Sequence, residues 1–380
     1  MRPTLPDSES GPLFVIAGGG TAGHVMPGLA VAEALVDAGH ERSRIHFIGA
    51  RRGMEATMVP DAGYSVSLFD TRGIKRSLSP SNLPAVLNLS QAVRRATRLF
   101  RRINPSVVVS VGGYASVPAV TAAKLTRVPV LVVSYDAVPG KASRLAARLA
   151  TVSAVAFDSS PLPRKVVTGA PLRPEILTVD PIRDRAPARA TLGLPADRFT
   201  VLVFGGSLGS GALNAVMRTF VSDHAGRGDL SVRHVYGTRN EDGSWKAPEV
   251  PGGLVYQPVA FETRMDLAYA AADLVVARAG ATTVAELAAL GVPSILVPWP
   301  LAAEDHQTAN AKALADAGGA VVIPEPQFDA PRLGAEIDRL RAEPDALRAM
   351  STGARSVGRR GAAAAIARLA EELALGEDDR

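Results

Sequence analysis

Apolar residues recur along the chain in short runs, separated by longer segments with helical spacing. The runs at 13–17 and 107–111 are continuous rather than alternating, which is typical of parallel strands covered on both faces. Segments such as 83–103 carry apolar residues at the spacing of a helix. In the first half of the chain we expect strands at 13–17, 45–48, 64–68, 107–111, 128–133, 152–157 and 165–168, and helices at 27–38, 83–103 and 118–125.

The alternation starts again after a Pro-, Arg- and Asp-rich stretch at 174–195, which has the composition of a linker. Two Rossmann-like, doubly wound parallel-sheet α/β domains are therefore expected, facing each other across a cleft. We place them at 1–175 and 176–357, and we expect 358–380, with an Ala-rich helix at 361–375, to pack back on the first. The second half should hold a helix at 211–221 and strands at 199–204, 232–236, 254–257, 274–277, 294–297 and 320–323.

Composition narrows the class of protein. Of the 380 residues 47% are apolar, enough for a core in each of two domains, and none is cysteine, which excludes disulfides and thiolate metal sites. No apolar run could span a membrane, and the polar segment 1–11 does not resemble a signal peptide. Aromatic residues are 5%, without the basic and aromatic pattern of nucleic-acid binding. Neither an Asp-x-Asp triplet nor zinc-ligand spacing of His occurs, so no cofactor is expected, although stimulation by a divalent cation leaves no signal to read.

Charge is distributed unevenly. No Asp or Glu occurs from Thr71 to Tyr135, a stretch that should give this half of the protein a basic face. Within 72–102, cations alternate with Leu83, Val86, Leu87 and Leu89, a pattern that can lie on an anionic membrane surface. The alternative is an ordinary amphipathic helix whose apolar side is core. The cations of the acid-free stretch are Arg72, Lys75, Arg76, Arg94, Arg95, Arg98, Arg101, Arg102, Lys124 and Arg127.

Three Gly-containing loops follow predicted strands, at 17–24, 111–118 and 204–210. Such loops let backbone N–H groups approach a phosphate, although a tight structural turn explains the second equally well. In the first, Gly18, Gly20 and Gly23 have the G-x-G-x-x-G spacing, but the expected strand at 45–48 is not followed directly by the acid of the NAD fingerprint, which disfavours NAD. His24 ends this loop, and it is either a general base for a sugar hydroxyl or a residue that orients the loop.

The segment 277–287, followed by 305–310, is the most informative. A small Gly-containing turn leads from a strand into a helix that we expect to begin at Thr282 or Thr283. Free N–H groups at such a helix start bind phosphate, and Glu286, one turn later, could receive a ribose diol. Together these features indicate a nucleoside diphosphate site. The alternative is a plain capping box running from Thr283 to Glu286.

In this order the motifs resemble those of the MurG family, peripheral membrane glycosyltransferases that add N-acetylglucosamine to lipid I, making lipid II of peptidoglycan. The resemblance covers nearly the whole chain and is strongest at 18–30, 111–114 and 277–319. It implies a GT-B fold and an inverting transfer from UDP-N-acetylglucosamine, bound by the second domain. The acceptor that it implies is the C4 hydroxyl of the muramyl residue of undecaprenyl-linked lipid I, at the cytoplasmic face of the cell membrane.

The resemblance also implies roles for individual residues. His24 and Asp136 are the candidate catalytic bases. Backbone N–H groups at 281–285 would bind phosphate, Glu286 the ribose and the backbone near Glu262 the uracil. The substrate-binding candidates are Thr21, Ala22, Gly23, Gly113, Tyr114, Asp136, Arg173, Ser207, Glu262, Ala281, Thr282, Thr283, Val284, Ala285, Glu286, His306, Gln307 and Asn310.

The chain departs from the family at three places. Val133-Ser134-Tyr135-Asp136 stands where the family usually has His-Glu-Gln-Asn, and Leu208 stands for a Gln. Glu262 follows the aromatic Phe261 in the uracil-contacting segment, where the family commonly has an aliphatic residue. These departures leave other readings open besides a divergent family member: a paralogue acting on another lipid or a secondary metabolite, an epimerase of UDP-N-acetylglucosamine, or a non-catalytic protein that binds UDP-sugars.

Overall fold

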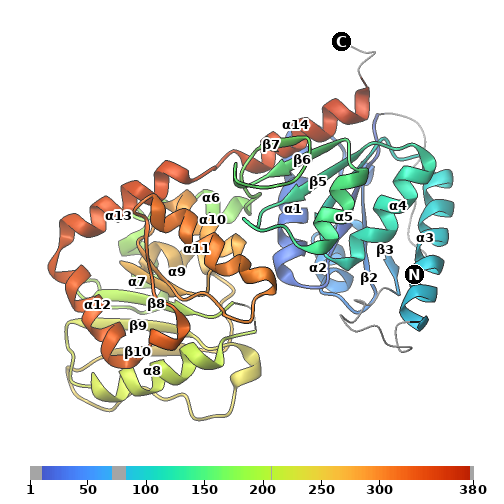
Figure 1. Ribbon diagram of the computed structural model, residues 1–380. Coiled ribbons are helices and arrows are strands. Elements are labelled where there is room, and N and C mark those ends of the chain that lie inside the picture. The colour runs from blue at the N-terminus through green and yellow to red at the C-terminus, as the bar shows by residue number, and fades with distance from the viewer. Residues whose placement is uncertain (1–10, 71–82, 207, 377–380) are drawn as a thin grey trace. The chain divides into compact units, whose positions relative to one another are not determined.

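The structure, a computed structural model, describes residues 11–70, 83–206 and 208–376, with the backbone alone at Ala22 and 83–87. The chain divides into two compact units (Figure 1). Unit 1 comprises residues up to Arg173 together with those from Arg360 onward, and unit 2 comprises Pro174–Arg359.

Unit 1 is built on a seven-stranded parallel sheet in the order β3-β2-β1-β4-β5-β6-β7. The chain runs outward from β1 to β3 and then returns to the other side of β1, so the strand order reverses between β1 and β4. The strands are β1 (Phe14–Gly18), β2 (Ile45–Ala50), β3 (Ser65–Phe69), β4 (Val107–Gly112), β5 (Val130–Ser134), β6 (Val152–Val155) and β7 (Lys165–Val167).

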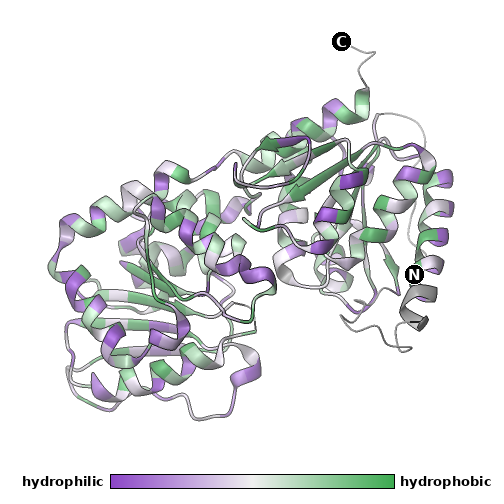
Figure 2. Ribbon diagram, in the orientation of Figure 1, coloured by the Kyte–Doolittle hydropathy of each residue, from purple (hydrophilic) through white to green (hydrophobic). Residues whose placement is uncertain are grey.

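Helices cover both faces of this sheet, as continuous apolar strands require. Val15 and Ala17 of β1 pack with α3, α4 and α5, whereas α1 and α14 lie on the opposite face, where Phe14 and Ile16 are buried. Figure 2 shows the apolar strands between helices whose outer sides are hydrophilic. The helices of unit 1 are α1 (Ala22–Asp37), α2 (Glu55–Asp61), α3 (Leu83–Ile103), α4 (Val117–Thr126), α5 (Lys141–Leu149) and α14 (Ala362–Leu375).

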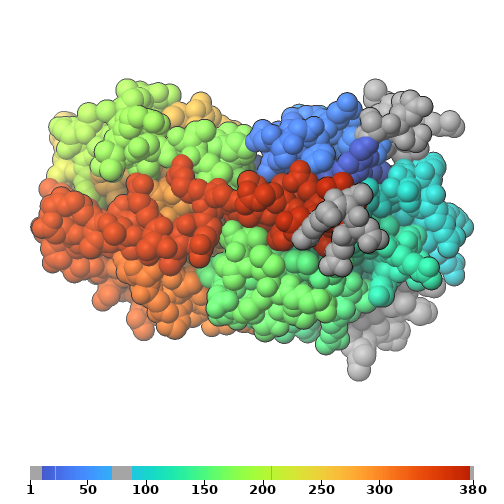
Figure 3. Space-filling model, turned by 90° about the horizontal axis from the view of Figure 1, so that it is seen from above, coloured from blue at the N-terminus to red at the C-terminus, as the bar shows by residue number. Residues whose placement is uncertain are grey.

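The last helix, α14, is the sequence-distant part of unit 1. It contacts α1, β4 and β5, and His40 at the end of α1 pairs with Glu371 at 2.8 Å. In Figure 3 this red helix lies between the blue N-terminal elements and the green segments of the same unit. Its Ala-rich side is buried, with Ile366 and Ala370 fully covered.

Unit 2 repeats the plan with six parallel strands in the order β10-β9-β8-β11-β12-β13. Leu202 and Val275 face a core with α7, α9, α10 and α11, while Val201 and Val203 face α8 and α12. The elements are α6 (Pro174–Leu177), α7 (Arg185–Leu192), β8 (Phe199–Phe204), α8 (Gly211–Asp223), β9 (Leu230–Val235), β10 (Val255–Val259), α9 (Met265–Ala271), β11 (Leu274–Ala277), α10 (Ala281–Leu290), β12 (Ser294–Leu296), α11 (His306–Asp316), β13 (Ala320–Val322), α12 (Ala330–Ala342) and α13 (Pro344–Val357).

The expected pair of doubly wound parallel sheets is confirmed, but the interpretation of 174–195 as a linker is wrong. This stretch forms α6 and α7, and Ile176 and Ala188 belong to the core of unit 2. Arg189 is buried as well, where its guanidinium donates to the carbonyl of Ala271 and pairs with Asp273. A composition rich in Pro and Arg therefore conceals short helices that are anchored by buried contacts.

The expected start of the first helix at Pro27 is also wrong, because α1 begins five residues earlier, at Ala22. Proline in a helix interior lacks the N–H that would bond the carbonyl four residues before it, here Gly23. In this structure the hydroxyl of Tyr135 donates to the Gly23 carbonyl at 2.7 Å instead. A distant side chain thus satisfies the acceptor that Pro27 leaves open.

Candidate functional site

In unit 1 two Gly-containing loops leave neighbouring strands at the point where the strand order reverses. The loop at 18–20 follows β1 and the loop at 112–113 follows β4, its pairing partner. In open α/β sheets this reversal at the carboxyl ends of the strands is the usual place for a ligand. The polar residues of the expected acceptor site are carried by these loops and by the segment after β5.

Several of these glycines are needed for packing rather than for a ligand. A Cβ at Gly113 would lie 2.6 Å from the Gly19 carbonyl oxygen, and a Cβ at Gly18 would lie 2.4 Å from Val111 Cγ2. The two loops therefore fit together only without side chains. Gly20 differs, because its φ of +99° favours glycine while nothing lies within 4 Å of its Cβ position, which leaves space for a ligand.

A buried carboxylate that sequence reasoning missed lies beneath the first loop. Glu55, at the start of α2, is 1% exposed and accepts the backbone N–H groups of Gly20 at 2.8 Å and Ala50 at 2.5 Å. A Cβ at Gly19, Gly49 or Gly53 would lie 2.1–2.2 Å from an atom of the Glu55 side chain. Those glycines make room for this carboxylate, a relation visible in sequence only as a Glu flanked by glycines.

His24 lies in the first turn of α1, where its Nδ1 is 3.2 Å from the hydroxyl oxygen of Thr21. Its ring lies over the 112–113 loop, since a Cβ at Gly112 would be 3.2 Å from His24 Cδ2. Burial lowers the pKa of His24 below its usual 6.5, and the negative charges of Asp136 and Glu55 oppose that shift. A neutral imidazole that donates from Nδ1 to Thr21 leaves Nε2 free to take a proton.

The structure brings the segment after β5 to the same place. Tyr135 is buried with its ring centroid 6.3 Å from that of His24, and burial raises the pKa of its phenol. Asp136 is partly buried and close enough for its charge to act on His24. Gly113 lies in the adjoining loop, and Tyr114, which follows it, is 48% exposed. Arg173 is half-buried at the end of unit 1.

In unit 2 the corresponding reversal lies between β8 and β11. The helix after β11 begins at Ala281 with Gly280 as its N-cap, one or two residues before the expected start. The capping-box alternative is therefore wrong, because Thr283 and Glu286 lie inside α10 and no side chain caps it. The backbone N–H groups of the first turn, which includes Ala281, Thr282 and Thr283, have no intrahelical acceptor. Val284 follows, bonded to the Gly280 carbonyl, and Ala285 comes next along the helix.

Arg278, in the loop before α10, is a second organising residue that sequence reasoning missed. It is 8% exposed, and its guanidinium donates to Ser210 Oγ at 2.8 and 3.1 Å and to the Val297 carbonyl at 3.1 Å. It also forms an ion pair with Glu325. One side chain thus joins the loops that follow β8, β11, β12 and β13. No local motif announces this, since the partners are far apart in sequence.

Glu286 and Asn310 are both held by neighbours. Glu286 is 6% exposed, and the hydroxyl of Tyr269 donates to its Oε2 at 2.8 Å. The Asn310 amide is fully buried and donates to the carbonyl of Ala279, in the loop before α10. The Asn310 side chain thus holds the backbone of the loop before α10.

His306 and Gln307 begin α11. His306 Nδ1 lies 2.8 Å from the Ala303 carbonyl oxygen, an acceptor that requires Nδ1 to carry the proton and leaves Nε2 as an acceptor. Gln307 Oε1 accepts the backbone N–H of Trp299 at 2.9 Å. The preceding residues, Glu304 and Asp305, have φ of +56° and +53°, a left-handed backbone that is costly for side-chain-bearing residues.

Two further candidates follow β8 and β10. The Glu262 carboxylate is almost buried, accepting from Arg233 Nε at 2.7 Å and from the Arg264 backbone N–H, while the preceding Phe261 is 53% exposed. A contact of this segment with a base would thus use backbone atoms or Phe261 rather than the Glu262 carboxylate. Ser207 lies outside the described residues.

The described part of the basic stretch is an amphipathic helix with a core-facing apolar side. Ala92, Ala96, Leu99 and Phe100 of α3 are buried in unit 1. The cations Arg94, Arg95, Arg98, Arg101 and Arg102 are exposed. The side chains of Leu83, Val86 and Leu87, and the residues Arg72, Lys75 and Arg76, lie outside the described residues.

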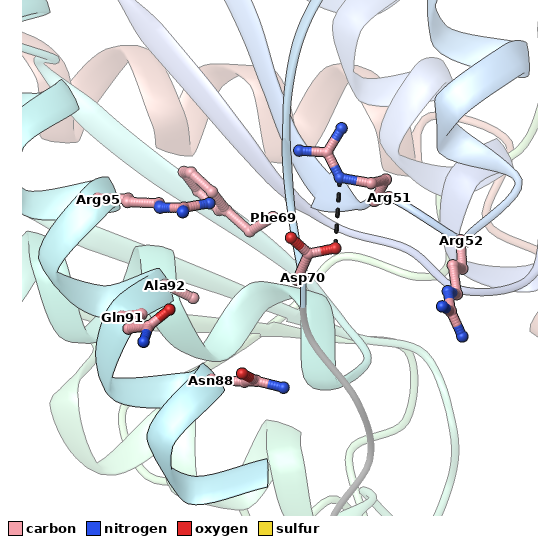
Figure 4. Close-up of a pocket in the computed structure, with 8 residues that line it drawn as sticks. All are labelled: Arg51, Arg52, Phe69, Asp70, Asn88, Gln91, Ala92 and Arg95. Atoms are coloured by element: carbon pink, nitrogen blue, oxygen red, sulfur yellow. Dashed lines mark ion pairs between the residues drawn. The ribbon is translucent and has the colours of Figure 1, made fainter. Parts of the chain in front are cut away.

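A polar cavity of about 230 Å³ opens beside this helix (Figure 4). It lies between α3 and the ends of β2 and β3, and Arg51 in its wall pairs with Asp70 at 3.3 Å. Its lining carries three guanidinium groups and one carboxylate: Arg51, Arg52, Phe69, Asp70, Asn88, Gln91, Ala92 and Arg95.

The described residues contain neither a cluster of metal-ligand type nor a membrane-spanning helix. No group of His, Asp or Glu side chains there has the arrangement of a metal site. No helix within the same residues is both long and apolar enough to cross a bilayer.

Comparison with known proteins identifies the family. Residues 14–155 match the N-terminal domain and residues 200–371 the C-terminal domain of glycosyltransferase family 28. A UDP-N-acetylglucosamine–N-acetylmuramyl-(pentapeptide) pyrophosphoryl-undecaprenol N-acetylglucosamine transferase of Desulforudis audaxviator is 38% identical, covering 95% of this chain and 98% of its own. The like-named protein of Saccharopolyspora erythraea is also 38% identical, covering 96% and 94%.

Among solved structures, the crystal structure of MurG from Acinetobacter baumannii is similar, with a TM-score of 0.74 at 29% identity over 95% of this chain and 99% of that one. The expected GT-B fold is thereby confirmed. The chain belongs to the MurG family of glycosyltransferases, within glycosyltransferase family 28.

Proposed function

We propose that this protein transfers N-acetylglucosamine from UDP-N-acetylglucosamine to the C4 hydroxyl of the muramyl residue of lipid I, forming lipid II. The names of its relatives, which match nearly end to end, support the substrates. The observation that carries the chemistry is His24, a neutral imidazole at the strand-order reversal of unit 1 with Asp136 and Glu55 nearby.

The reaction is a direct displacement with inversion. The acceptor oxygen bonds to the anomeric carbon of the donor sugar while the bond from that carbon to the phosphate oxygen breaks. His24 Nε2 takes the hydroxyl proton, and the charge of Asp136 stabilises the imidazolium that results. Because burial keeps the pKa of His24 low, the imidazole is unprotonated at neutral pH, as a base must be.

The UDP leaving group is bound by unit 2. The N–H groups of the first turn of α10, which have no acceptor within the helix, stabilise its developing negative charge, and the guanidinium of Arg278 holds the surrounding loops in register. Glu286 accepts from the ribose hydroxyls. His306 Nε2 and the loop around it accept from the sugar, supported by the contact of Asn310 with the Ala279 carbonyl. We assign no role to a metal ion.

Unit 1 works at the cytoplasmic surface of the membrane as a peripheral protein. The exposed arginines of α3 and the guanidinium-lined cavity beside it give this surface an excess of positive charge, which attracts anionic headgroups. The lipid acceptor would then be presented to the same unit that carries His24.

Transfer of labelled N-acetylglucosamine to a short-chain lipid I analogue tests this function, with free UDP measured in parallel. We expect a disaccharide product and one UDP released per sugar transferred. UDP-N-acetylmannosamine formed without acceptor would indicate an epimerase. Tight UDP binding without product on any lipid-linked sugar would indicate a binding protein, and product on another lipid would indicate a paralogue.

A further inference from the structure

We infer that Glu55 and Tyr135 are positioning residues that hold the Gly20–His24 segment from its two ends and so fix where the His24 imidazole stands. Neither residue touches a substrate in this account. The inference rests on the proposed function for its kinetic consequences, while the contacts themselves stand independently of it.

Glu55 holds the beginning of the segment. Its carboxylate is buried, and its two oxygens accept the N–H groups of Gly20 and Ala50 at 2.8 and 2.5 Å, so the loop after β1 is tied to the end of β2. The side chain fits only because Gly19, Gly49 and Gly53 lack a Cβ. A buried charge bonded to backbone on both oxygens cannot shift without leaving N–H groups unpaired, which makes the loop geometry rigid.

Tyr135 holds the other end. Its hydroxyl donates to the Gly23 carbonyl at 2.7 Å, the acceptor that Pro27 leaves open, and lies 3.3 Å from the Val111 carbonyl. The bond fixes the first turn of α1 against the ends of β4 and β5. The hydroxyl therefore sits between the helix that carries His24 and the strand that ends in the Gly112 loop beneath its ring.

Glu55 has a second effect that Tyr135 does not share. Two negative charges act on His24, those of Glu55 on α2 and Asp136 after β5, and the phenol of Tyr135 is neutral. Removing the charge of Glu55 should therefore lower the pKa of His24, whereas removing the hydroxyl of Tyr135 should move the ring without changing its titration through charge.

Three variants of the full chain test the inference: Glu55→Gln, Glu55→Asp and Tyr135→Phe. Glu41→Gln, an exposed acid of the same unit, is the matched control. The readouts are kcat and the KM of each substrate in lipid I transfer, UDP affinity by calorimetry, circular dichroism, and the His24 titration by NMR of histidine-labelled protein, assigned with His24→Gln.

We expect kcat to fall roughly 10- to 100-fold in all three variants, with UDP affinity unchanged within about two-fold, because a displaced base slows chemistry in unit 1 alone. In Glu55→Gln the His24 titration should move to lower pH by about half a unit, whereas Glu55→Asp and Tyr135→Phe should leave it in place. Tyr135→Phe is close in shape to the original residue, so it keeps the test meaningful if the Glu55 variants unfold.

Folded variants with wild-type kcat would overturn the inference, as would a His24 titration that does not respond to Glu55→Gln. Failure of the proposed function looks different. If His24→Gln retains full activity while Glu55→Gln still moves the His24 titration, His24 is held as described but is not the base.

Discussion

The two units have the same order of parallel strands, but the charged side chains that they bury next to their loops have opposite signs. In unit 1 the buried group next to the loop after β1 is the Glu55 carboxylate, which accepts the N–H of Gly20. In unit 2 the buried group is the Arg278 guanidinium, which donates to Ser210 and to the carbonyl of Val297. Both residues tie together segments that follow different strands, so each fixes the shape of the sheet edge at which we propose that a ligand binds.

The sign of the buried charge suits each unit to a different task. A carboxylate that occupies a loop N–H and repels anions makes the first loop of unit 1 a poor phosphate site, but it favours a proton arriving on His24. A guanidinium next to a helix start whose N–H groups have no acceptor within the helix favours a diphosphate. These opposite charges support the proposal that unit 1 carries the proton transfer and that unit 2 stabilises the charge of the leaving group.

The largest effect is expected from His24→Ala. Loss of the base should lower kcat roughly 10²- to 10⁴-fold while UDP affinity stays constant, because the donor site belongs to the other unit. His40→Gln serves as the control, since that ring faces Glu371 rather than the Gly-containing loops. An unchanged kcat in His24→Ala would move the role of base to Asp136.

Arg278→Lys should affect unit 2 and the binding of UDP. An ammonium cannot reproduce the fork that joins Ser210, Val297 and Glu325, so UDP affinity should fall about 10- to 100-fold by calorimetry. Arg348→Lys, on an exposed side chain of α13, should leave affinity as it is. Equal loss of UDP affinity in His24→Ala and Arg278→Lys would contradict the proposal that UDP binding depends on unit 2 and proton transfer on unit 1.

A smaller effect is expected at the ribose. Glu286→Ala should raise the donor KM about 10-fold with little change in kcat, since a ribose contact is made in the ground state and the transition state alike. Glu286→Gln keeps an acceptor for Tyr269 and separates the ribose contact from the packing of α10. A donor KM equal to that of the wild type in both variants would remove Glu286 from the ribose.

The last prediction concerns acid stability, which should not distinguish the units. Burial lowers the pKa of His46 in unit 1 to about 4 and that of His234 in unit 2 to about 3. Above pH 6.5 neither the folded nor the unfolded state binds this proton. Below it the unfolded state binds first, so each unit should lose on the order of a few kcal/mol as pH falls toward 4. Thermal unfolding between pH 7 and 4 measures this, and a flat Tm over that range would contradict it.

The features predicted from sequence were those encoded locally. Every expected strand has a counterpart within a few residues, and the loops at 18–20 and 112–113 follow β1 and β4 as expected, because apolar runs and glycines mark them directly. The polar residues after β5 were identified through the family resemblance, which compares positions along the chain. Asp136 is identified in this way, whereas His24 follows from its place at the end of the first Gly-containing loop; in the structure the charge of Asp136 acts on His24.

The sequence does not reveal the organising residues Glu55 and Arg278, because their partners are distant along the chain. Glu55 bonds Gly20 across 35 positions, and Arg278 reaches Ser210 across 68 and Glu325 across 47. The early start of α1 escaped for the same reason, since the Tyr135 hydroxyl that supports it lies 112 positions from Gly23. A hydrogen bond between residues that only the fold brings together leaves no pattern in the local sequence.

The most direct test of the account is the pH dependence of kcat for lipid I transfer, measured for the wild type and for His24→Ala. A buried neutral base predicts a kcat that is constant above about pH 6.5 and falls at lower pH, because protonation of His24 removes the base and burial holds its pKa below 6.5. His24→Ala should lose this limb together with most of the rate. A wild-type kcat that rises only above pH 8, or an acid limb that persists in His24→Ala, would contradict the account.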